Sequence, residues 1–157
     1  MYRLQTGFTV ADAMTRDPVT ITPSKTLRDA SKLMTKEHVG ALLVKDGSSI
    51  VGILTEQDIV RKAVSQGGNC SEKKVNEIMA ESLVSTSPSE DIFEALRIMR
   101  DYNIRHLPVY AEGQFAGLIT MKDILRVEPD LFEILVEKIE LREIERKPVK
   151  KYKLSER

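Results

Sequence analysis

Residues 10–34 read VADAMTRDPVTITPSKTLRDASKLM, and residues 75–99 read VNEIMAESLVSTSPSEDIFEALRIM. The two stretches align without a gap at a shift of 65 residues. Identical pairs along them are Val10/Val75, Met14/Met79, Val19/Val84, Pro23/Pro88, Ser24/Ser89, Ala30/Ala95 and Met34/Met99. The match continues through Val44/Val109, Gly52/Gly117, Thr55/Thr120, Asp58/Asp123, Ile59/Ile124 and Arg61/Arg126. A fixed period over this length indicates a duplicated supersecondary unit.

Both copies predict the same order of elements. A short extended stretch, 18–22 or 83–87, is followed by a proline, which disfavours helix in the residue before it. Ser24 and Ser89 are the predicted N-caps of an amphipathic helix in each copy. Two strands and a short closing helix follow, with the strands at 41–45 and 49–55 around Asp46-Gly47, and at 106–110 and 114–120 around Glu112-Gly113.

One such unit is too small to bury a sufficient core by itself. We therefore predict an α+β fold in which two tandem β-α-β-β-α repeats pack through their sheets with pseudo-two-fold symmetry. Repeat 1 spans residues 10–67, repeat 2 spans 75–127, and 128–157 form a C-terminal helix and a basic tail. The apolar stripe of that helix is expected to pack on its own domain or on a twin chain.

The composition limits the classes of function that this chain can have. Lys+Arg and Asp+Glu are both 24, so no overall field favours nucleic acid or an acidic membrane. Cys70 is the only cysteine, which excludes an intrachain disulfide and a cysteine-cluster metal site. No apolar run is long enough to span a membrane and no signal-peptide core is evident, so we expect a cytoplasmic protein. With two histidines and no Walker-type glycine loop, we expect no enzyme activity, no cofactor and no metal.

A G-x-x-T-x-x-D motif closes each unit, as GILTEQD at 52–58 and GLITMKD at 117–123. Together with the Met-x-x-x-Pro start and the RHLPV strand at 105–109, this layout resembles the cystathionine-beta-synthase (CBS) domain pair, or Bateman module, over about residues 10–127. The resemblance implies a regulatory module that binds AMP, ADP, ATP or S-adenosylmethionine in clefts between the repeats. It also implies a homodimer, and some family members are purely structural or dimerising domains.

The motif residues have suitable chemistry for an adenosine ligand. An ionised carboxylate, such as Asp58 or Asp123, can accept both hydroxyls of a ribose diol. Thr55 and Thr120 carry hydroxyls that can reach a ribose or a first phosphate. Thr-x-x-Asp is equally a capping box that stabilises a helix without any ligand, and the two interpretations are compatible. The strand glycines indicate close approach either of a ligand or of packed backbone.

By the family pattern, each cleft combines the aspartate of one repeat with the opening strand of the other. The first predicted cleft contains Thr55, Asp58, Ser85, Thr86, Arg105, His106, Pro108 and Lys122. The second contains Thr20, Ile21, Thr22, Val39, Gly40, Thr120 and Asp123. The backbone of the opening strands is expected to read the adenine edge. The first cleft contains more cations, so we predict that it binds phosphorylated adenosine more tightly than the second.

The sequence therefore favours a regulatory module that binds an adenine nucleotide and acts on a separate, unknown partner protein. One alternative is a constitutive dimerisation scaffold in which the Thr/Asp pairs only cap helices. Another is a nucleic-acid-associated regulator that uses the basic C-terminal tail.

Overall fold

The computed structural model of the chain describes residues 5–81 and 84–133. The first half contains α1 (Val10–Ala13), β1 (Thr20–Ile21), α2 (Leu27–Glu37), β2 (Ala41–Asp46), β3 (Ser49–Thr55) and α3 (Glu56–Asp58). The helix beginning at α3 continues as a π-helix (Ile59–Ala63) and a 3-10 turn (Val64–Gln66). The second half of the sequence contains 3-10 turns at Cys70–Glu72 and Val75–Glu77, α4 (Ile92–Tyr102), β4 (His106–Ala111), β5 (Gln114–Thr120) and α5 (Met121–Val127).

Both predicted hairpins are confirmed. Strands β2 and β3 pair antiparallel from Ala41↔Thr55 to Asp46↔Ser49, and Gly47 in their turn has a φ of 61°. Strands β4 and β5 repeat this pairing, with Glu112 and Gly113 both at positive φ. A positive φ at these positions is the geometry that a tight hairpin turn requires.

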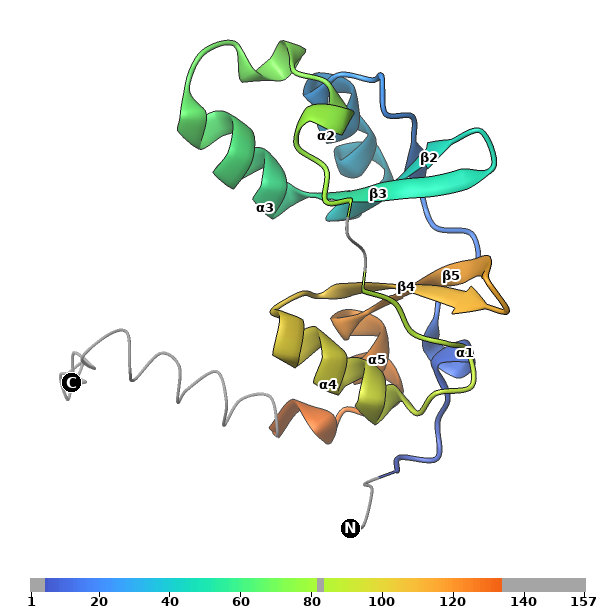
Figure 1. The fold of residues 1–157 in the computed structure, drawn as a ribbon. Coiled ribbons are helices and arrows are strands. Elements are labelled where there is room, and N and C mark those ends of the chain that lie inside the picture. The colour runs from blue at the N-terminus through green and yellow to red at the C-terminus, as the bar shows by residue number, and fades with distance from the viewer. Residues whose placement is uncertain (1–4, 82–83, 134–157) are drawn as a thin grey trace, which may run out of the picture.

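The two sheets face one another in the middle of the molecule, and the helices lie on the outside (Figure 1). A cluster of apolar residues from both repeats fills the space between the sheets, with Ala41, Leu43 and Ile53 from repeat 1 and Leu118 from repeat 2. Two further clusters, one in each half, lie between a sheet and its helices. The predicted α+β architecture of two tandem repeats packed through their sheets is confirmed.

The opening strands of the two repeats differ. In repeat 1, β1 runs parallel to β2, and the Leu43 amide donates to the Val19 carbonyl at 3.2 Å. Pro108 occupies the position of Leu43 in repeat 2, and proline has no amide hydrogen to donate. The opening strand of repeat 2 is therefore reduced to a single parallel bridge, Thr86↔Val109.

The predicted N-caps were wrong by two residues. Helix α2 is capped by Thr26, whose Oγ1 accepts from the Asp29 amide at 3.1 Å, and the Thr26 amide donates to the Asp29 carboxylate at 3.2 Å. Helix α4 is capped by Asp91, whose carboxylate accepts from the Phe93 amide at 2.8 Å. Ser24 lies instead in the turn that follows Pro23, where the Lys25 amide donates to the Thr22 carbonyl.

The segments that begin the two sequence repeats are exchanged in space. Residues 10–15, here called the first leading segment, pack on repeat 2, where Val10 is fully buried beside Ile92 and Met99. Figure 1 shows α1, which belongs to this segment, in the same half of the molecule as α4 and α5. Backbone bonds between Thr15 and Leu118, at 2.8 and 2.9 Å, fix the segment against β5.

Residues 75–80, the second leading segment, pack on repeat 1 in the equivalent way. Val75 and Ile78 are buried in the cluster that contains Leu27. Ala80 and Ile53 exchange two backbone hydrogen bonds at 2.9 and 3.0 Å. Each three-dimensional half is thus completed by residues that belong, in sequence, to the other repeat.

The chain after α5 is described only as far as residue 133. Leu131 is buried in the core of repeat 2, which places the start of the predicted C-terminal segment against its own domain. The rest of the predicted C-terminal helix and the basic tail lie outside the described residues.

Candidate functional site

Both Thr-x-x-Asp motifs form complete capping boxes. In repeat 1, the Thr55 amide and hydroxyl donate to Asp58 Oδ2 at 3.0 and 2.9 Å, and the Asp58 amide donates to Thr55 Oγ1 at 3.2 Å. Thr120 and Asp123 form the same three bonds, at 2.9, 2.9 and 3.2 Å. Each Thr/Asp pair therefore caps its helix as the capping interpretation predicted. Each capping box uses only one carboxylate oxygen of its aspartate, Oδ2.

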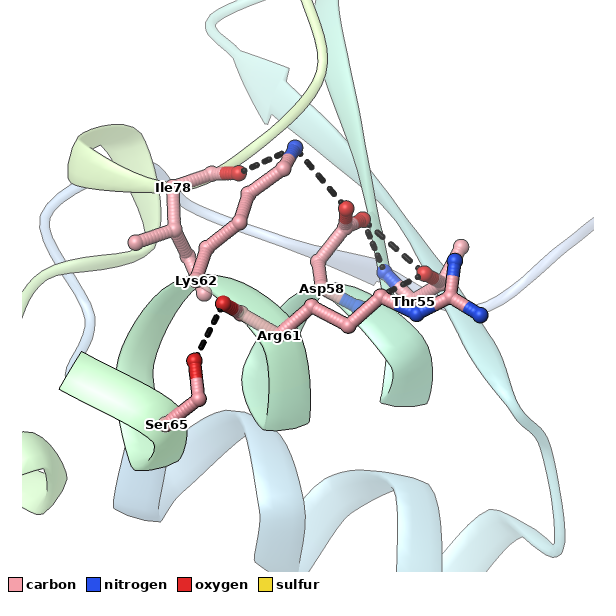
Figure 2. A network of polar contacts seen from close by, with 6 residues as sticks. All are labelled: Thr55, Asp58, Arg61, Lys62, Ser65 and Ile78. Carbon is pink, nitrogen blue, oxygen red and sulfur yellow. Dashed lines mark hydrogen bonds and ion pairs between the residues drawn. The ribbon is translucent and has the colours of Figure 1, made fainter.

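The second oxygen of Asp58 is paired with a lysine. Lys62 Nζ lies 2.8 Å from Asp58 Oδ1 and also donates to the Ile78 carbonyl at 3.2 Å. Figure 2 shows the ammonium between these two groups. The Asp58 side chain is 16% exposed, so this ion pair is more sheltered than an ordinary surface pair. Lys62 thus links the closing helix of repeat 1 to the second leading segment.

The second oxygen of Asp123 is in a different environment. The position equivalent to Lys62 is Val127, which has no charge. Within residues 5–81 and 84–133, no hydrogen bond or ion pair is made to Asp123 Oδ1. Asp123 therefore retains an unused acceptor oxygen, whereas a ligand at Asp58 would have to displace Lys62.

His106 begins β4 and pairs with Thr120, the N-cap residue of α5. Burial of the half-buried imidazole lowers its pKa, and the neighbouring Arg105 cation lowers it further. The carboxylates of Asp123 and Glu56 raise the pKa of His106, and the Lys122 ammonium lowers it. All of these charged groups therefore lie close enough to the imidazole to act on its charge. The charged groups that act on the pKa of His106 are therefore Arg105, Asp123, Glu56 and Lys122, and Asp58 is not among them.

Sequence reasoning missed two charged residues at these sites. Lys62 could have been found, because a residue four positions after Asp58 on a helix lies on the same face. Glu56 could not, because its position depends on a contact across the hairpin. Its amide donates to the Gly40 carbonyl at 3.0 Å, and its carboxylate lies over Gly40, where a Cβ would be 3.1 Å from Oε2.

The predicted opening-strand residues are only partly available to a ligand. Thr86 is 8% exposed, and among the described residues its Oγ1 has no hydrogen-bond partner. The Thr86 amide donates to the Pro108 carbonyl at 3.0 Å, so it cannot read an adenine edge. Ser85 is exposed.

In repeat 1, Ile21 is buried and Val39 packs against the core. Thr20, Ile21 and Thr22 border a hollow beside α2 that does not include Asp123. The three residues therefore share a surface feature with α2, rather than with the second predicted aspartate.

The strand glycines are explained by packing of the leading segments. A Cβ on Gly52 would lie 2.7 Å from Met79 Sδ and 2.9 Å from the Ala80 carbonyl oxygen. A Cβ on Gly117 would lie 2.5 Å from the Thr15 carbonyl oxygen. Of the two interpretations left open for these glycines, close approach of backbone is the one that the structure realises.

The class of protein follows from these features: a duplicated α+β unit, folded face to face, with a capped T-x-x-D turn in each half. The CBS domain family model matches residues 10–65 and 75–130, and the chain belongs to this family. No helix in the described part of the chain is long and apolar enough to cross a membrane. The same residues contain no cluster of three or more His, Cys, Asp or Glu that could hold a metal ion.

Similar proteins and solved structures support the assignment to the CBS domain family. The CBS domain-containing protein YhcV of Bacillus subtilis is 31% identical over 115 residues, which cover 73% of this chain and 81% of YhcV. A CBS-domain containing protein of Agrobacterium tumefaciens superposes with a TM-score of 0.73 at 27% identity, covering 76% of this chain and 98% of that one. The CBS domain pair of protein MJ0100, solved with 5′-methylthioadenosine and S-adenosyl-L-methionine, has a TM-score of 0.68 at 28% identity and covers 76% and 94% of the two chains.

Proposed function

We propose that this CBS domain pair is a regulatory module that binds an adenosine-containing ligand between its repeats and acts on a separate partner protein. AMP, ADP, ATP and S-adenosylmethionine are the candidate ligands. The observation that carries the proposal is the unused acceptor oxygen of Asp123, held at a fixed place by the capping box. A carboxylate held in this way can accept the hydroxyls of a ribose without reorganisation. The adenosine compounds bound to the MJ0100 domain pair support the same ligand class.

The two sites are proposed to differ in ligand preference. At Asp58, the Lys62 ammonium provides a cation that can turn toward a phosphate once a ribose has displaced it from Oδ1. At Asp123, Val127 replaces this lysine, so no cation pairs with the carboxylate among the described residues, while Glu56, Arg105 and Lys122 all act on the nearby His106 imidazole. We therefore propose that phosphorylated ligands prefer the Asp58 site, and that neutral or cationic ones such as S-adenosylmethionine prefer the Asp123 site.

Lys62 also suggests how occupancy could be transmitted. Because Lys62 donates to the Ile78 carbonyl, its displacement by a ligand would release one contact of the second leading segment. The packing between the halves would then change, and with it the surface offered to a homodimer mate or a partner protein. The proposal places this action in the cytoplasm and requires no catalytic step.

Calorimetry with adenosine, AMP, ATP and S-adenosylmethionine tests the ligand proposal. Asp58→Asn and Asp123→Asn keep a capping acceptor but lose the charge that receives both hydroxyls. We expect Asp58→Asn to weaken AMP binding about tenfold or more, which corresponds to about 1.4 kcal/mol, and Asp123→Asn to weaken it less. Equal losses from both variants would contradict the asymmetry. Absence of binding to the wild type would favour the scaffold alternative.

Lys62→Met separates the two roles of the lysine. Removal of the ammonium frees Asp58 Oδ1, so adenosine should bind as tightly as before or more tightly. AMP should lose affinity relative to adenosine, because the phosphate loses its cation. Lys36→Met, at a lysine of α2 that is 79% exposed, is the matched control and should leave both affinities unchanged.

A further inference from the structure

A hollow of about 530 Å³ lies in repeat 1, between β1, the end of β2 and one face of α2. Its charged lining residues are Lys25, Lys32, Lys45 and Asp29. Thr20 and Thr22 border it from β1 and the residue that follows. Asp29 and Lys32 are three residues apart on α2, which places them on one side of the helix, and Lys25 lies in the turn just before the N-cap Thr26.

The three ammonium groups of the hollow have no ion-pair partner in the part of the chain that the structure describes. The one carboxylate, Asp29, is engaged in the capping box with Thr26. Hydrogen bonds from Thr26 lower the pKa of Asp29, and Lys25 and Lys32 lower it further. Asp29 therefore stays ionised, and three cations against one anion leave the hollow with two surplus positive charges.

The duplicated copy does not carry this charge pattern. Lys25, Asp29, Lys32 and Lys45 correspond to Glu90, Glu94, Arg97 and Tyr110 at the shift of 65 residues. Arg97 is paired with Glu94 at 2.8 Å, and Tyr110 packs edge-on against Phe115. The basic lining is thus a feature of repeat 1 and does not follow from the fold that both repeats share.

We propose that this hollow binds a small polyanion of the phosphate class, such as a diphosphate group, at a site separate from the Asp58 and Asp123 sites. Lysine ammonium groups are compact charges with three donors each, suited to several oxygens of one compact anion. The hydroxyls of Thr20 and Thr22 add neutral donors. The volume lies within the range of small-ligand pockets, which is about 300–1,000 Å³.

The probe for this site is inorganic pyrophosphate, titrated into the full chain by calorimetry and followed on backbone amides by NMR. We expect the amide signals of Thr22, Lys32 and Lys45 to move. The double variant Lys32→Gln/Lys45→Gln should weaken binding at least tenfold. The control Lys36→Gln, on the same helix but outside the hollow, should bind like the wild type, and equal unfolding temperatures verify the fold of both variants.

A second comparison identifies the source of the phosphate group. If the hollow takes a free polyanion, pyrophosphate affinity survives Asp58→Asn and adenosine does not compete. If it takes the phosphate tail of a nucleotide, ATP moves the same amides and adenosine alone does not. The proposal is overturned if the wild type does not bind pyrophosphate, if the double variant binds it as tightly, or if the shifts map to Thr55 and Lys62. None of these outcomes depends on binding of adenosine between the repeats.

Discussion

Gly52 and Gly117 lie where a leading segment runs against a strand, and at each of them an added Cβ would meet a backbone carbonyl oxygen of that segment, at 2.9 and 2.5 Å. An added methyl group on Gly52 would meet the Ala80 carbonyl at 2.9 Å, and the carbonyl is held by its bond from the Ile53 amide. Gly40 provides the contrast, because the three atoms nearest to its added methyl group all belong to the flexible Glu56 side chain, the closest at 3.1 Å.

We therefore predict that Gly52→Ala lowers the free energy of unfolding by about 1–3 kcal/mol, the usual cost of overpacking. Gly40→Ala, the matched control, should change it by less than about 0.5 kcal/mol. Urea unfolding measures both. Similar values for the two variants would contradict the packing role of Gly52.

The lowered pKa of His106 predicts the sign of one contribution to the pH dependence of stability. Its pKa in the folded protein is below the ordinary 6.5, because burial and Arg105 disfavour the imidazolium more than Asp123 and Glu56 favour it. The unfolded state therefore binds more protons as the pH falls through 6.5, and folding loses stability until the pH is below the folded pKa. Above 6.5, both states are neutral at this position and the stability is fully present.

The prediction is that the unfolding temperature of the wild type falls more steeply between pH 7.5 and pH 5 than that of His106→Asn. The difference between the two profiles isolates the contribution of this imidazole. Parallel profiles would show that its pKa is the same in the folded and unfolded states.

At the scale of elements, local signals predicted the hairpins well and the helix starts less well. Gly47 and Gly113 mark the two turns, since glycine adopts positive φ without strain. Asp46 itself ends β2 and pairs with Ser49, so the first turn lies at residues 47 and 48, one residue later than predicted. The predicted cap of α2 was Ser24, whereas the structure has Thr26, which is also chemically suitable. Thr26 prevails because Asp29 stands three residues later and completes a capping box.

We expect Thr26→Ala to cost about 1 kcal/mol of stability, the usual value for a lost N-cap. Ser24→Ala should cost less than about 0.5 kcal/mol, because Ser24 is exposed in a turn. Thermal unfolding of the two variants tests the assignment directly, and a larger loss from Ser24→Ala would reverse it.

In the opening strands and closing helices, the local sequence pattern is not sufficient to predict the structure. Repeat 2 lacks the backbone hydrogen bond that Leu43 donates in repeat 1, because Pro108 has no amide hydrogen. This loss could be predicted only if it were known that the opening strand lies beside Pro108. The closing helix of repeat 1 becomes a π-helix at Ile59–Ala63, whereas α5 remains regular over Met121–Val127. No residue in the motif distinguishes these two outcomes.

At the scale of the whole molecule, the exchanged leading segments join the two halves into one structure. Ile78 belongs to repeat 2 in sequence but is buried in the core of repeat 1 with Leu27 and Met34. Removing its side chain should therefore weaken the other half of the chain.

We predict that Ile78→Ala costs about 2–5 kcal/mol, the usual range for a buried isoleucine. Amide hydrogen exchange should show the largest loss of protection in α2 and β2, which lie in repeat 1. Val10→Ala is the symmetric control, and its largest effect should fall on α4. Loss of protection confined to α4 in the Ile78 variant would contradict the exchange.

The sequence by itself determined the duplication, the strand–turn–strand units and the two capped aspartates, because periodicity, turn residues and capping spacing act over a few neighbouring positions. The family and the residues of the Thr-x-x-Asp motifs could be predicted for the same reason. Only the tertiary structure decided that the leading segments change places, that the strand glycines accommodate them, and that Lys62 also bonds to the Ile78 carbonyl. The same holds for the basic hollow of repeat 1. These features depend on contacts between residues far apart in the chain, and no local pattern specifies which distant surface a short apolar segment will cover.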